Sequence, residues 1–307
     1  MVNVSRVEFH GYSDCIRLEN ASVRVTLGHQ CGGRVLEYSC GGVNVLALDP
    51  SQAGWTPRSG APAIDPWGGR FDIGPEKMLP PHPVLWLGAW SAEVDEAGIV
   101  RMTSQVDPVT GAQIVREFEL DADSSRLRCT QTITNTSSSD RVWFHWSRTL
   151  VTGGGIVVVP LTRPSRFPNG YVMYGLDTSL DYQPDDPNIR VRDGLLEIVD
   201  TPRHPKLCMD SHAGWLAYLA ESDMLFVKRF ATFPDRMYGD IVAPTVSVWY
   251  YEHLLCELEP IGPEERLAPG KSASYAEEWW LVPHKFPARR DALDPAEIAE
   301  TVRRVAT

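Results

Sequence analysis

The chain has 307 residues, 43% of them hydrophobic and 22% charged, so it can form a substantial core and is not predicted to be disordered. The 29 Lys and Arg residues are outnumbered by 40 Asp and Glu residues, which gives a formal net charge of −11. This acidic balance argues against a nucleic-acid partner, because binding along a phosphate backbone needs a basic surface. No stretch of about 18 or more apolar residues occurs, so neither a membrane-spanning helix nor a membrane partner is expected.

The N-terminus and the cysteines indicate the compartment. The first 15 residues are polar and alternating, without a positive start followed by an apolar run, so no secretory signal is expected. The six cysteines are scattered and form no CxxC pair, which argues against a structural zinc site. Such cysteines are typical of buried thiols in a reducing compartment, and the predicted location is the cytoplasm.

Short alternating segments follow one another along the chain, which favours an all-β fold of antiparallel strands. Val23, Val25 and Leu27 would share one face of an early strand. Further strands are expected at 35–38, 43–48, 99–106, 112–120, 126–134, 141–151, 155–160, 195–199, 214–220, 223–230, 244–251, 253–259 and 273–282. The 24 Gly and 24 Pro residues supply turn signals between them.

Two segments interrupt this pattern, and one helix follows it. Residues 49–90 and 163–194 are rich in proline and are expected to be long loops, the first kept ordered by its tryptophans. A C-terminal helix is predicted over about 294–306, with Asp294 as N-cap and Pro295 at the first helical position. Without a linker or internal repeat, residues 1–307 are predicted to form one β-sandwich domain with its core at about 20–283.

Glu257 and Glu259 are the strongest candidates for chemistry. They lie two residues apart on a predicted strand that follows an aromatic one, so they should project from the same face. Two carboxylates near a buried region shift each other's pKa values apart, which can produce an acid and a base. The alternative is an exposed strand face that carries two solvated acids.

A second candidate group lies on the predicted strand at 141–151. His145 is suited to proton transfer, Trp146 to stacking on a sugar ring, and Arg148 to holding a carboxylate or orienting hydroxyls. The alternative for His145 is a core histidine that is hydrogen-bonded to a neighbouring strand.

The segment 66–76 presents Trp67, Arg70, Asp72 and Glu76 within a short span that contains two adjacent glycines. It could form the wall of a polar pocket with an aromatic platform, or it could be a rigid turn. The glycines lack the GxGxxG spacing and a following helix, so phosphate binding there is not favoured.

Lys228 and Arg229 form a further candidate site, which could grip an anionic substituent such as a uronate or phosphate, or lie on a solvated strand face. No HxH or HExxH spacing occurs, so a catalytic zinc is not expected. No cofactor or metal is predicted, although calcium at Glu257 and Glu259 stays open because oxygen-rich sites can hold it.

Several motifs, in their order along the chain, resemble the galactose mutarotase-like superfamily. They are the polar turn at 134–137 before a His-bearing strand, Glu259-Pro260 ahead of the segment 267–271, and the tryptophan-rich ending at 277–281. The nearer likeness is to the uncharacterised bacterial DUF4380-type group, and it covers about residues 20–283. It rests on Gly68-Gly69 through Pro75-Glu76, on the segment 146–149 and on 257–259.

This resemblance implies a β-supersandwich fold and sugar chemistry. In aldose 1-epimerases a late glutamate takes the proton of the anomeric hydroxyl and a mid-chain histidine protonates the ring oxygen. Glu259 matches that base, with Glu257 as its close rival, and His145 matches the acid. The chain departs from the pattern because Trp146, Ser147 and Arg148 follow the histidine, and because the early Asn and "HGG" motif is absent.

Three functions are compatible with these residues. The leading one is an aldose 1-epimerase-like enzyme that acts on a sugar ring through Glu259 and His145, with Trp67 or Trp146 stacking and Arg70 or Arg148 bonding hydroxyls. The second is a lyase or glycosidase on uronate-containing or modified glycans, with Lys228 and Arg229 neutralising the carboxylate. The third is a carbohydrate-binding module without catalysis. The expected partner is a small molecule or oligosaccharide, bound by a monomer or homodimer.

Overall fold

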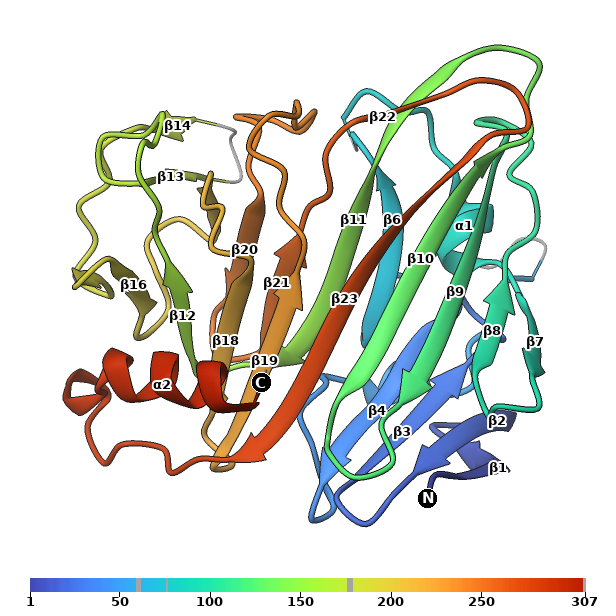
Figure 1. The fold of residues 1–307 in the computed structure, drawn as a ribbon, viewed down its shortest axis with the longest axis horizontal. Coiled ribbons are helices and arrows are strands. Elements are labelled where there is room, and N and C mark those ends of the chain that lie inside the picture. Colours follow the sequence, from blue (N-terminus) through green and yellow to red (C-terminus); the bar gives the residue numbers. More distant parts are fainter. Residues whose placement is uncertain (59–61, 76, 176–178, 306–307) are drawn as a thin grey trace.

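The computed structural model describes residues 1–58, 62–75, 77–175 and 179–305. Among these residues, two antiparallel sheets of 13 and 10 strands lie face to face, as Figure 1 shows. This is the all-β sandwich with a short C-terminal helix that the sequence predicts.

The larger sheet contains, in spatial order, β1 (Asn3–Phe9), β2 (Tyr12–Glu19), β3 (Val23–Gly28), β4 (Arg34–Cys40), β6 (Gly69–Gly74), β11 (Arg141–Thr152), β21 (Leu255–Pro260), β20 (Val246–Tyr251), β17 (Lys206–Met209), β13 (Tyr171–Tyr174) and β14 (Leu180–Asp181), with β5 (Val43–Asn44) beside β4 and β22 (Glu265–Leu267) beside β11. The smaller sheet contains β15 (Ile189–Arg192), β16 (Leu195–Ile198), β12 (Ile156–Pro160), β18 (Trp215–Ala220), β19 (Met224–Phe230), β23 (Ser272–Pro283), β10 (Leu127–Asn135), β9 (Ala112–Leu120), β8 (Val100–Thr103) and β7 (Ser91–Val94). Short helical segments are η1 (Pro50–Gln52), α1 (Pro83–Leu87), η2 (Arg290–Ala292) and α2 (Pro295–Val305).

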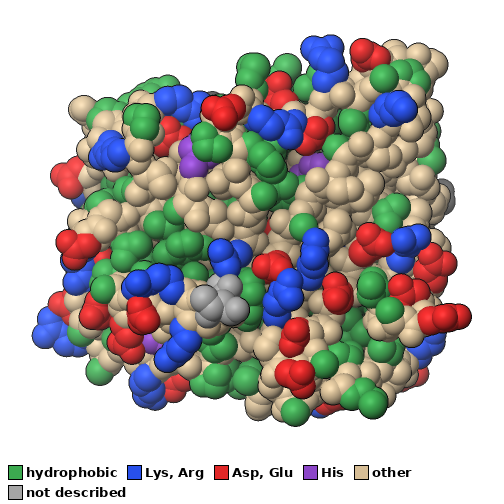
Figure 2. Space-filling view, viewed as in Figure 1, with side chains coloured by type: hydrophobic (Ala, Val, Ile, Leu, Met, Phe, Trp, Pro, Cys, Tyr) green, Lys and Arg blue, Asp and Glu red, His purple; other side chains and the backbone are tan. Residues whose placement is uncertain are grey.

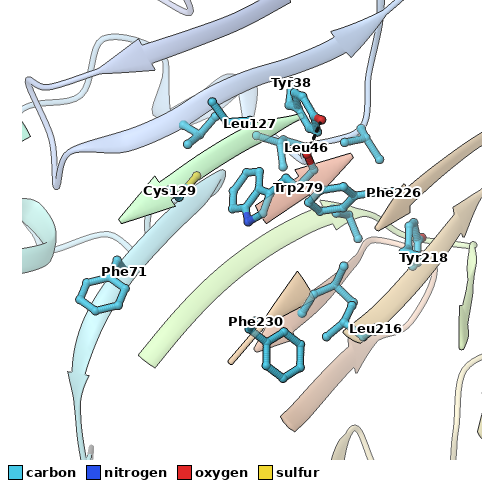
Figure 3. Packing of buried hydrophobic residues seen from close by; sticks show 14 of the residues in the cluster. Tyr38, Leu46, Phe71, Leu127, Cys129, Leu216, Tyr218, Phe226, Phe230 and Trp279 are labelled. Atoms are coloured by element: carbon cyan, nitrogen blue, oxygen red, sulfur yellow. Dashed lines mark hydrogen bonds between the residues drawn. The ribbon is translucent and has the colours of Figure 1, made fainter. Parts of the chain in front are cut away.

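The core lies between the two sheets and is built by strand alternation. In β9 and β10 every second residue is buried, as expected of strands with one face toward a core. Trp279 sits at the centre, with its ring centroid 5.3 Å from that of Phe226 and 6.0 Å from that of Tyr38 (Figure 3). The Tyr38 hydroxyl donates to the Ser125 carbonyl, so this buried phenol is satisfied.

Helix α2 covers part of the outer face of the smaller sheet (Figure 1). Ile298 and Val302 pack against Trp280 and the outward side chains of β12 and β18. Asp294 caps the helix, since its Oδ1 accepts from the Ala296 backbone N–H at 2.9 Å. The predicted helix is confirmed, with Pro295 as its first residue.

Several short strands lie where the sequence indicated loops or nothing regular. Among them, β6 lies inside the segment 49–90, β13, β14 and β15 lie inside 163–194, and β17 lies between two predicted strands. Each of these five has six residues or fewer, and all except β17 lie in the proline-rich segments that were expected to be loops. Four of them, β6, β13, β14 and β17, carry side chains of the candidate site.

The distribution of surface charges and the state of the cysteines are as expected from the amino-acid composition. Figure 2 shows acidic and basic side chains interspersed over one face of the molecule, the one that carries α2 in Figure 1. Within the described residues all six cysteines are free, and all except Cys40 are buried. No helix in the described part of the chain is long and apolar enough to cross a membrane.

Candidate functional site

Neighbouring strands of the larger sheet place polar and aromatic side chains on its outer face, away from the core. Residues directly opposite one another in an antiparallel pair share a face. The register pairs β6 with β11, β11 with β21, β21 with β20 and β20 with β17. The cross-strand partners that meet on this face are Arg70 with Arg148, Asp72 with Trp146, Leu150 with Glu257, Trp249 with Glu257, Ser247 with Glu259, and Lys206 with Trp249.

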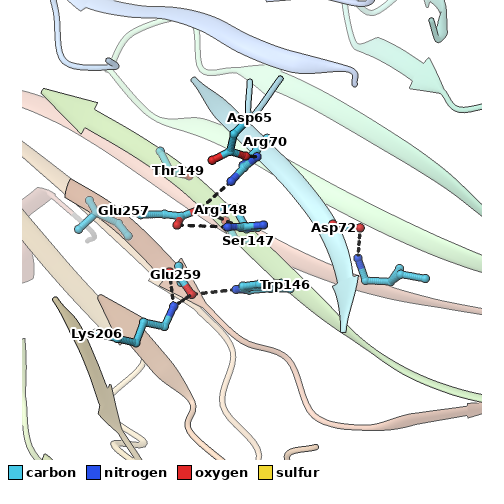
Figure 4. A network of polar contacts seen from close by, with 12 residues as sticks. Asp65, Arg70, Asp72, Trp146, Ser147, Arg148, Thr149, Lys206, Glu257 and Glu259 are labelled. Atoms are coloured by element: carbon cyan, nitrogen blue, oxygen red, sulfur yellow. Dashed lines mark hydrogen bonds and ion pairs between the residues drawn. The ribbon is translucent and has the colours of Figure 1, made fainter. Parts of the chain in front are cut away.

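Glu257 is held as an anion by two arginines (Figure 4). Its Oε1 accepts from Arg148 Nε at 2.8 Å and from Arg70 Nη2 at 3.5 Å, and its Oε2 accepts from Arg148 Nη2 at 3.4 Å. Arg70 is itself bonded to Asp65. Burial raises the pKa of Glu257, but the charges of Arg148 and Arg70 outweigh it and bring the pKa to about 2. This carboxylate therefore accepts hydrogen bonds and does not exchange protons near neutral pH.

Glu259 has the opposite character, although it lies two residues away. Lys206 Nζ is 2.5 Å from both of its oxygens, and Trp146 Nε1 donates to its Oε2 at 2.9 Å. Burial of the fully enclosed carboxylate is the largest influence and raises its pKa to about 7, with the Glu257 charge adding to the rise and Lys206 opposing it. A carboxyl group with a pKa near neutrality is suited to general acid–base work.

A pocket of 380 Å³ opens beside this pair and is lined by Glu257, whereas Glu259 lies buried behind Lys206 and Trp146. The size of the pocket falls in the range of roughly 300–1,000 Å³ that is usual for small-molecule sites. Arg148 stacks on the Trp146 ring, with its guanidinium carbon 4.2 Å from the ring centroid. The described lining residues are Lys77, Trp146, Arg148, Tyr174, Gly175, Leu180, Pro205, Lys206, Asp240, Ile241, Trp249 and Glu257.

His145 is not part of this group. It alternates with Trp146 on β11 and so points into the core between the sheets, where it is fully buried. Its Nε2 lies 3.1 Å from the Ala273 carbonyl oxygen, and its ring stacks on Tyr275 with the centroids 5.6 Å apart. Burial lowers its pKa to about 4, so the imidazole is neutral at physiological pH. His145 is therefore a core histidine that is hydrogen-bonded to another strand, which is the alternative that the sequence left open.

Lys228 and Arg229 do not reach the pocket either. Lys228 is enclosed between the sheets, 3.0 Å from Glu277 Oε2, and donates to Ser147 Oγ at 2.8 Å and Thr149 Oγ1 at 2.9 Å. Arg229 projects from the other face of β19, where it lines a separate surface pocket. Lys228 and Arg229 therefore do not form a shared anion-binding site.

The segment 66–76 contributes to the outer face in three ways. Trp67 packs against a small apolar cluster that contains Leu150, Leu255 and Trp249. Arg70 reaches Glu257, as described above. Asp72 is buried and lies 3.0 Å from His82 Nε2, so it serves an ion pair and does not line the pocket. Glu76, also a predicted site residue, lies outside the described residues.

The His82–Asp72 pair predicts a pH dependence of stability. Burial lowers the His82 pKa, but hydrogen bonding to Asp72 and its charge outweigh this and raise the pKa to about 9 from 6.5. A raised histidine pKa stabilises the fold fully below pH 6.5, and this contribution is lost as pH rises through 9. Denaturant titrations at pH 6 and pH 10 should show that His82→Gln costs roughly 1–3 kcal/mol at pH 6 and less at pH 10. The exposed His253→Gln is the matched control; an equal cost of His82→Gln at both pH values would contradict the assignment.

The calcium alternative finds no oxygen-rich cage at these carboxylates. Arg148 and Arg70 neutralise Glu257, and Lys206 neutralises Glu259. Within the described residues, no group of three His, Cys, Asp or Glu side chains is placed to hold a metal ion.

Lys206, Trp249 and Tyr174 are not predicted from the sequence. Lys206 begins β17, a four-residue strand, and reaches Glu259 only through the pairing of β17 with β20 and of β20 with β21. Trp249 and Tyr174 depend on the same long-range pairing. The signal for Trp249 is its place in the aromatic run at 249–251, just before the acidic strand.

Solved structures with the same architecture include proteins described as mutarotase-like. Protein Slr1438 from Synechocystis sp. PCC 6803 is similar with a TM-score of 0.62 and 13% identity, covering 91% of this chain and 99% of that one. A putative aldose 1-epimerase from Escherichia coli K12 has a TM-score of 0.59 and 10% identity, with 92% and 100% covered. A galactose mutarotase-like protein from Lactobacillus casei ATCC 334 has a TM-score of 0.59 and 11% identity, with 87% and 100% covered. These likenesses establish the mutarotase-like fold.

Sequence comparison gives the family. Among curated protein sequences there is no significant match. Residues 75–283 match the model of the family described as "Domain of unknown function (DUF4380)", which agrees with the predicted resemblance. That match includes β11, β17, β20 and β21, and β21 and β17 carry Glu257, Glu259 and Lys206. The chain therefore belongs to the DUF4380 family and has the galactose mutarotase-like fold.

Proposed function

We propose that the pocket binds a sugar ring and that the protein interconverts the anomers of that sugar, as an aldose 1-epimerase does. The observation that carries this proposal is the pair of enclosed carboxylates on β21 with opposite pKa shifts. Glu257 stays an anion that can accept hydrogen bonds from the sugar, whereas Glu259, with a pKa near neutrality, is suited to exchange the proton that acid–base chemistry at a sugar carbon requires. The shared fold with a putative aldose 1-epimerase adds support.

The lining of the pocket suits a sugar. Trp249 and Tyr174 are partly exposed and offer ring surfaces for the apolar face of a pyranose, whereas the Trp146 ring is buried under Arg148. Glu257 and Asp240 supply oxygen acceptors for hydroxyl groups, and the ammonium group of Lys206 supplies a donor. A site that combines aromatic surfaces with polar groups that fix the orientation of a ligand is typical of small-molecule recognition.

Anomer exchange needs one proton removed and one delivered. In the proposed reaction the sugar inserts between Glu259 and Lys206, Glu259 takes the proton of the C1 hydroxyl, and Lys206 gives a proton to the ring oxygen. The C1–ring oxygen bond breaks, the open aldehyde turns, and closure returns both protons. The two transfers assist each other: the charge of Glu259 raises the Lys206 pKa, so protonating Glu259 makes Lys206 a stronger acid. Lys206 thus takes the role that the family resemblance implied for His145.

Polarimetry on freshly dissolved sugars tests this proposal. The panel is α-glucose, α-galactose, glucuronate and galacturonate, each followed at pH 7 with and without protein. The expected result is faster relaxation to the anomeric equilibrium for at least one sugar, in proportion to protein concentration. Relaxation at the buffer rate for every sugar, with protein shown to be folded, would contradict it.

A sugar-binding protein without catalysis is the second candidate, and one observation favours it. Glu259 has no exposed surface, because Lys206 and Trp146 cover its oxygens. If the Lys206–Glu259 pair stays closed around a bound sugar, binding occurs without anomer exchange. The lyase alternative is less well supported, because Lys228, which was expected to neutralise the uronate carboxylate, lies between the sheets.

A further inference from the structure

We propose that the pocket is one end of a longer site, and that the protein binds a glycan of two or more sugar units along an aromatic shelf formed by Trp249, Tyr251 and Trp67. This inference rests on the proposed function, because it takes the first sugar unit to lie in the pocket. It adds the substrate class: an oligosaccharide, with its second unit on the shelf.

The shelf is continuous with the pocket. Trp249 lines the pocket, and Tyr251 follows two residues later on β20, so both project from the same sheet face. Their ring centroids are 5.5 Å apart with planes tilted by 45°. Same-face positions on a strand are roughly 6–7 Å apart, which is the scale of neighbouring sugar rings.

The floor of the shelf is fixed by packing. Leu150 on β11 and Leu255 on β21 are buried, and Trp67 and Trp249 pack against them while remaining partly exposed. Tyr251 is 39% exposed although its ring is large and apolar. Grouped aromatic side chains that stay exposed next to a polar pocket are typical of a surface that binds something.

The polar atoms of the shelf are available to a ligand. Within the described part of the chain, neither the indole N–H of Trp249 nor the hydroxyl of Tyr251 has a protein hydrogen-bond partner, and neither is buried without one. Aromatic rings with free polar edges can stack on the apolar face of a sugar and bond its hydroxyl groups at the same time. Glycans therefore fit the shelf better than a peptide, which would need backbone partners that this face of paired strands does not offer.

Titration calorimetry with sugars of increasing length tests the shelf. The probes are the free sugars glucose, galactose, mannose, glucuronate and galacturonate, and reducing di- and trisaccharides that end in each of them. The variants are Tyr251→Ala, which removes the ring, and Tyr251→Phe, which keeps it. Tyr182→Ala is the matched control, since Tyr182 is an exposed tyrosine whose ring contacts Phe167 and not the pocket.

The expected result is that a reducing disaccharide binds more tightly than its monosaccharide, and that Tyr251→Ala loses roughly three- to tenfold of that affinity. Tyr251→Phe and Tyr182→Ala should keep most of it, and the monosaccharide should bind all variants alike. A monosaccharide that binds with no gain on lengthening, or a gain that Tyr251→Ala leaves unchanged, overturns the shelf and leaves the proposed function standing. No binding of any probe overturns both.

Discussion

Replacing Glu259 by Gln should reduce the protein-dependent rate of anomer exchange by roughly 10²–10⁴-fold, the usual contribution of a general acid–base group. The amide has nearly the shape of the carboxylate and can still accept from Trp146 Nε1, so the pocket should keep its form. What is lost is the ability to take the C1 proton and the charge that holds the proton on Lys206. Sugar binding should change far less than the rate, which separates an enzyme from a binding protein.

The pH profile gives an independent check on the same residue. Glu259 accepts a proton only as a carboxylate, and its pKa is raised to about 7. The wild-type rate above the buffer background should therefore rise with pH through about 7 and then level off. Glu117→Gln, which removes a surface ion pair with Arg101, should leave both rate and profile unchanged. Full activity of Glu259→Gln would exclude Glu259 as the base.

Replacing Lys228 by Met should destabilise the fold far more than removing a charge from the surface. Lys228 and Glu277 are both fully enclosed, 3.0 Å apart. Removing the ammonium group leaves the Glu277 carboxylate, among the residues that the structure describes, with Trp279 Nε1 as its one remaining donor, 3.0 Å away. Breaking a buried pair in this way costs about 3–5 kcal/mol in the free energy of unfolding, a large part of the roughly 5–15 kcal/mol of a typical protein.

The companion variants make the stability prediction specific. Lys228→Met combined with Glu277→Leu removes both charges, and it should be more stable than Lys228→Met alone by about 2 kcal/mol or more. Lys285→Met, at an exposed lysine paired with Asp223, should change stability by less than about 1 kcal/mol. Urea denaturation of the wild type and these three variants measures this. A double variant no more stable than Lys228→Met would mean that the charge of Glu277 is not what destabilises the single variant.

Local alternation is enough to predict that Glu257 and Glu259 share a face, and that Trp146 and Arg148 do. It cannot say which face of β11 is buried, because both of its faces carry polar groups. His145 alternates with Trp146, and nothing in five consecutive residues shows which one meets the core. The buried face of β11 is determined by packing against β23, whose Ala273 carbonyl and Tyr275 ring contact His145.

Other parts of the site depend on pairing between distant segments. Lys206 is 53 positions from Glu259, and only the order β21–β20–β17 brings the two together.

Lys228 resembles a surface cation in the sequence because it adjoins Arg229. Inside the core, however, Ser147, Thr149 and Glu277 from two other strands form a polar site for it. A lysine can be buried where partners satisfy its charge, and those partners are not local in the sequence.

The most direct test of the central claim is a crystal structure of the protein soaked with the sugar that responds best in polarimetry. The account predicts a pyranose ring in the 380 Å³ pocket, with its C1 hydroxyl within hydrogen-bond distance of Glu259 and its ring oxygen beside Lys206 Nζ. A sugar bound elsewhere, or one whose C1 faces away from a closed Lys206–Glu259 pair, would contradict it.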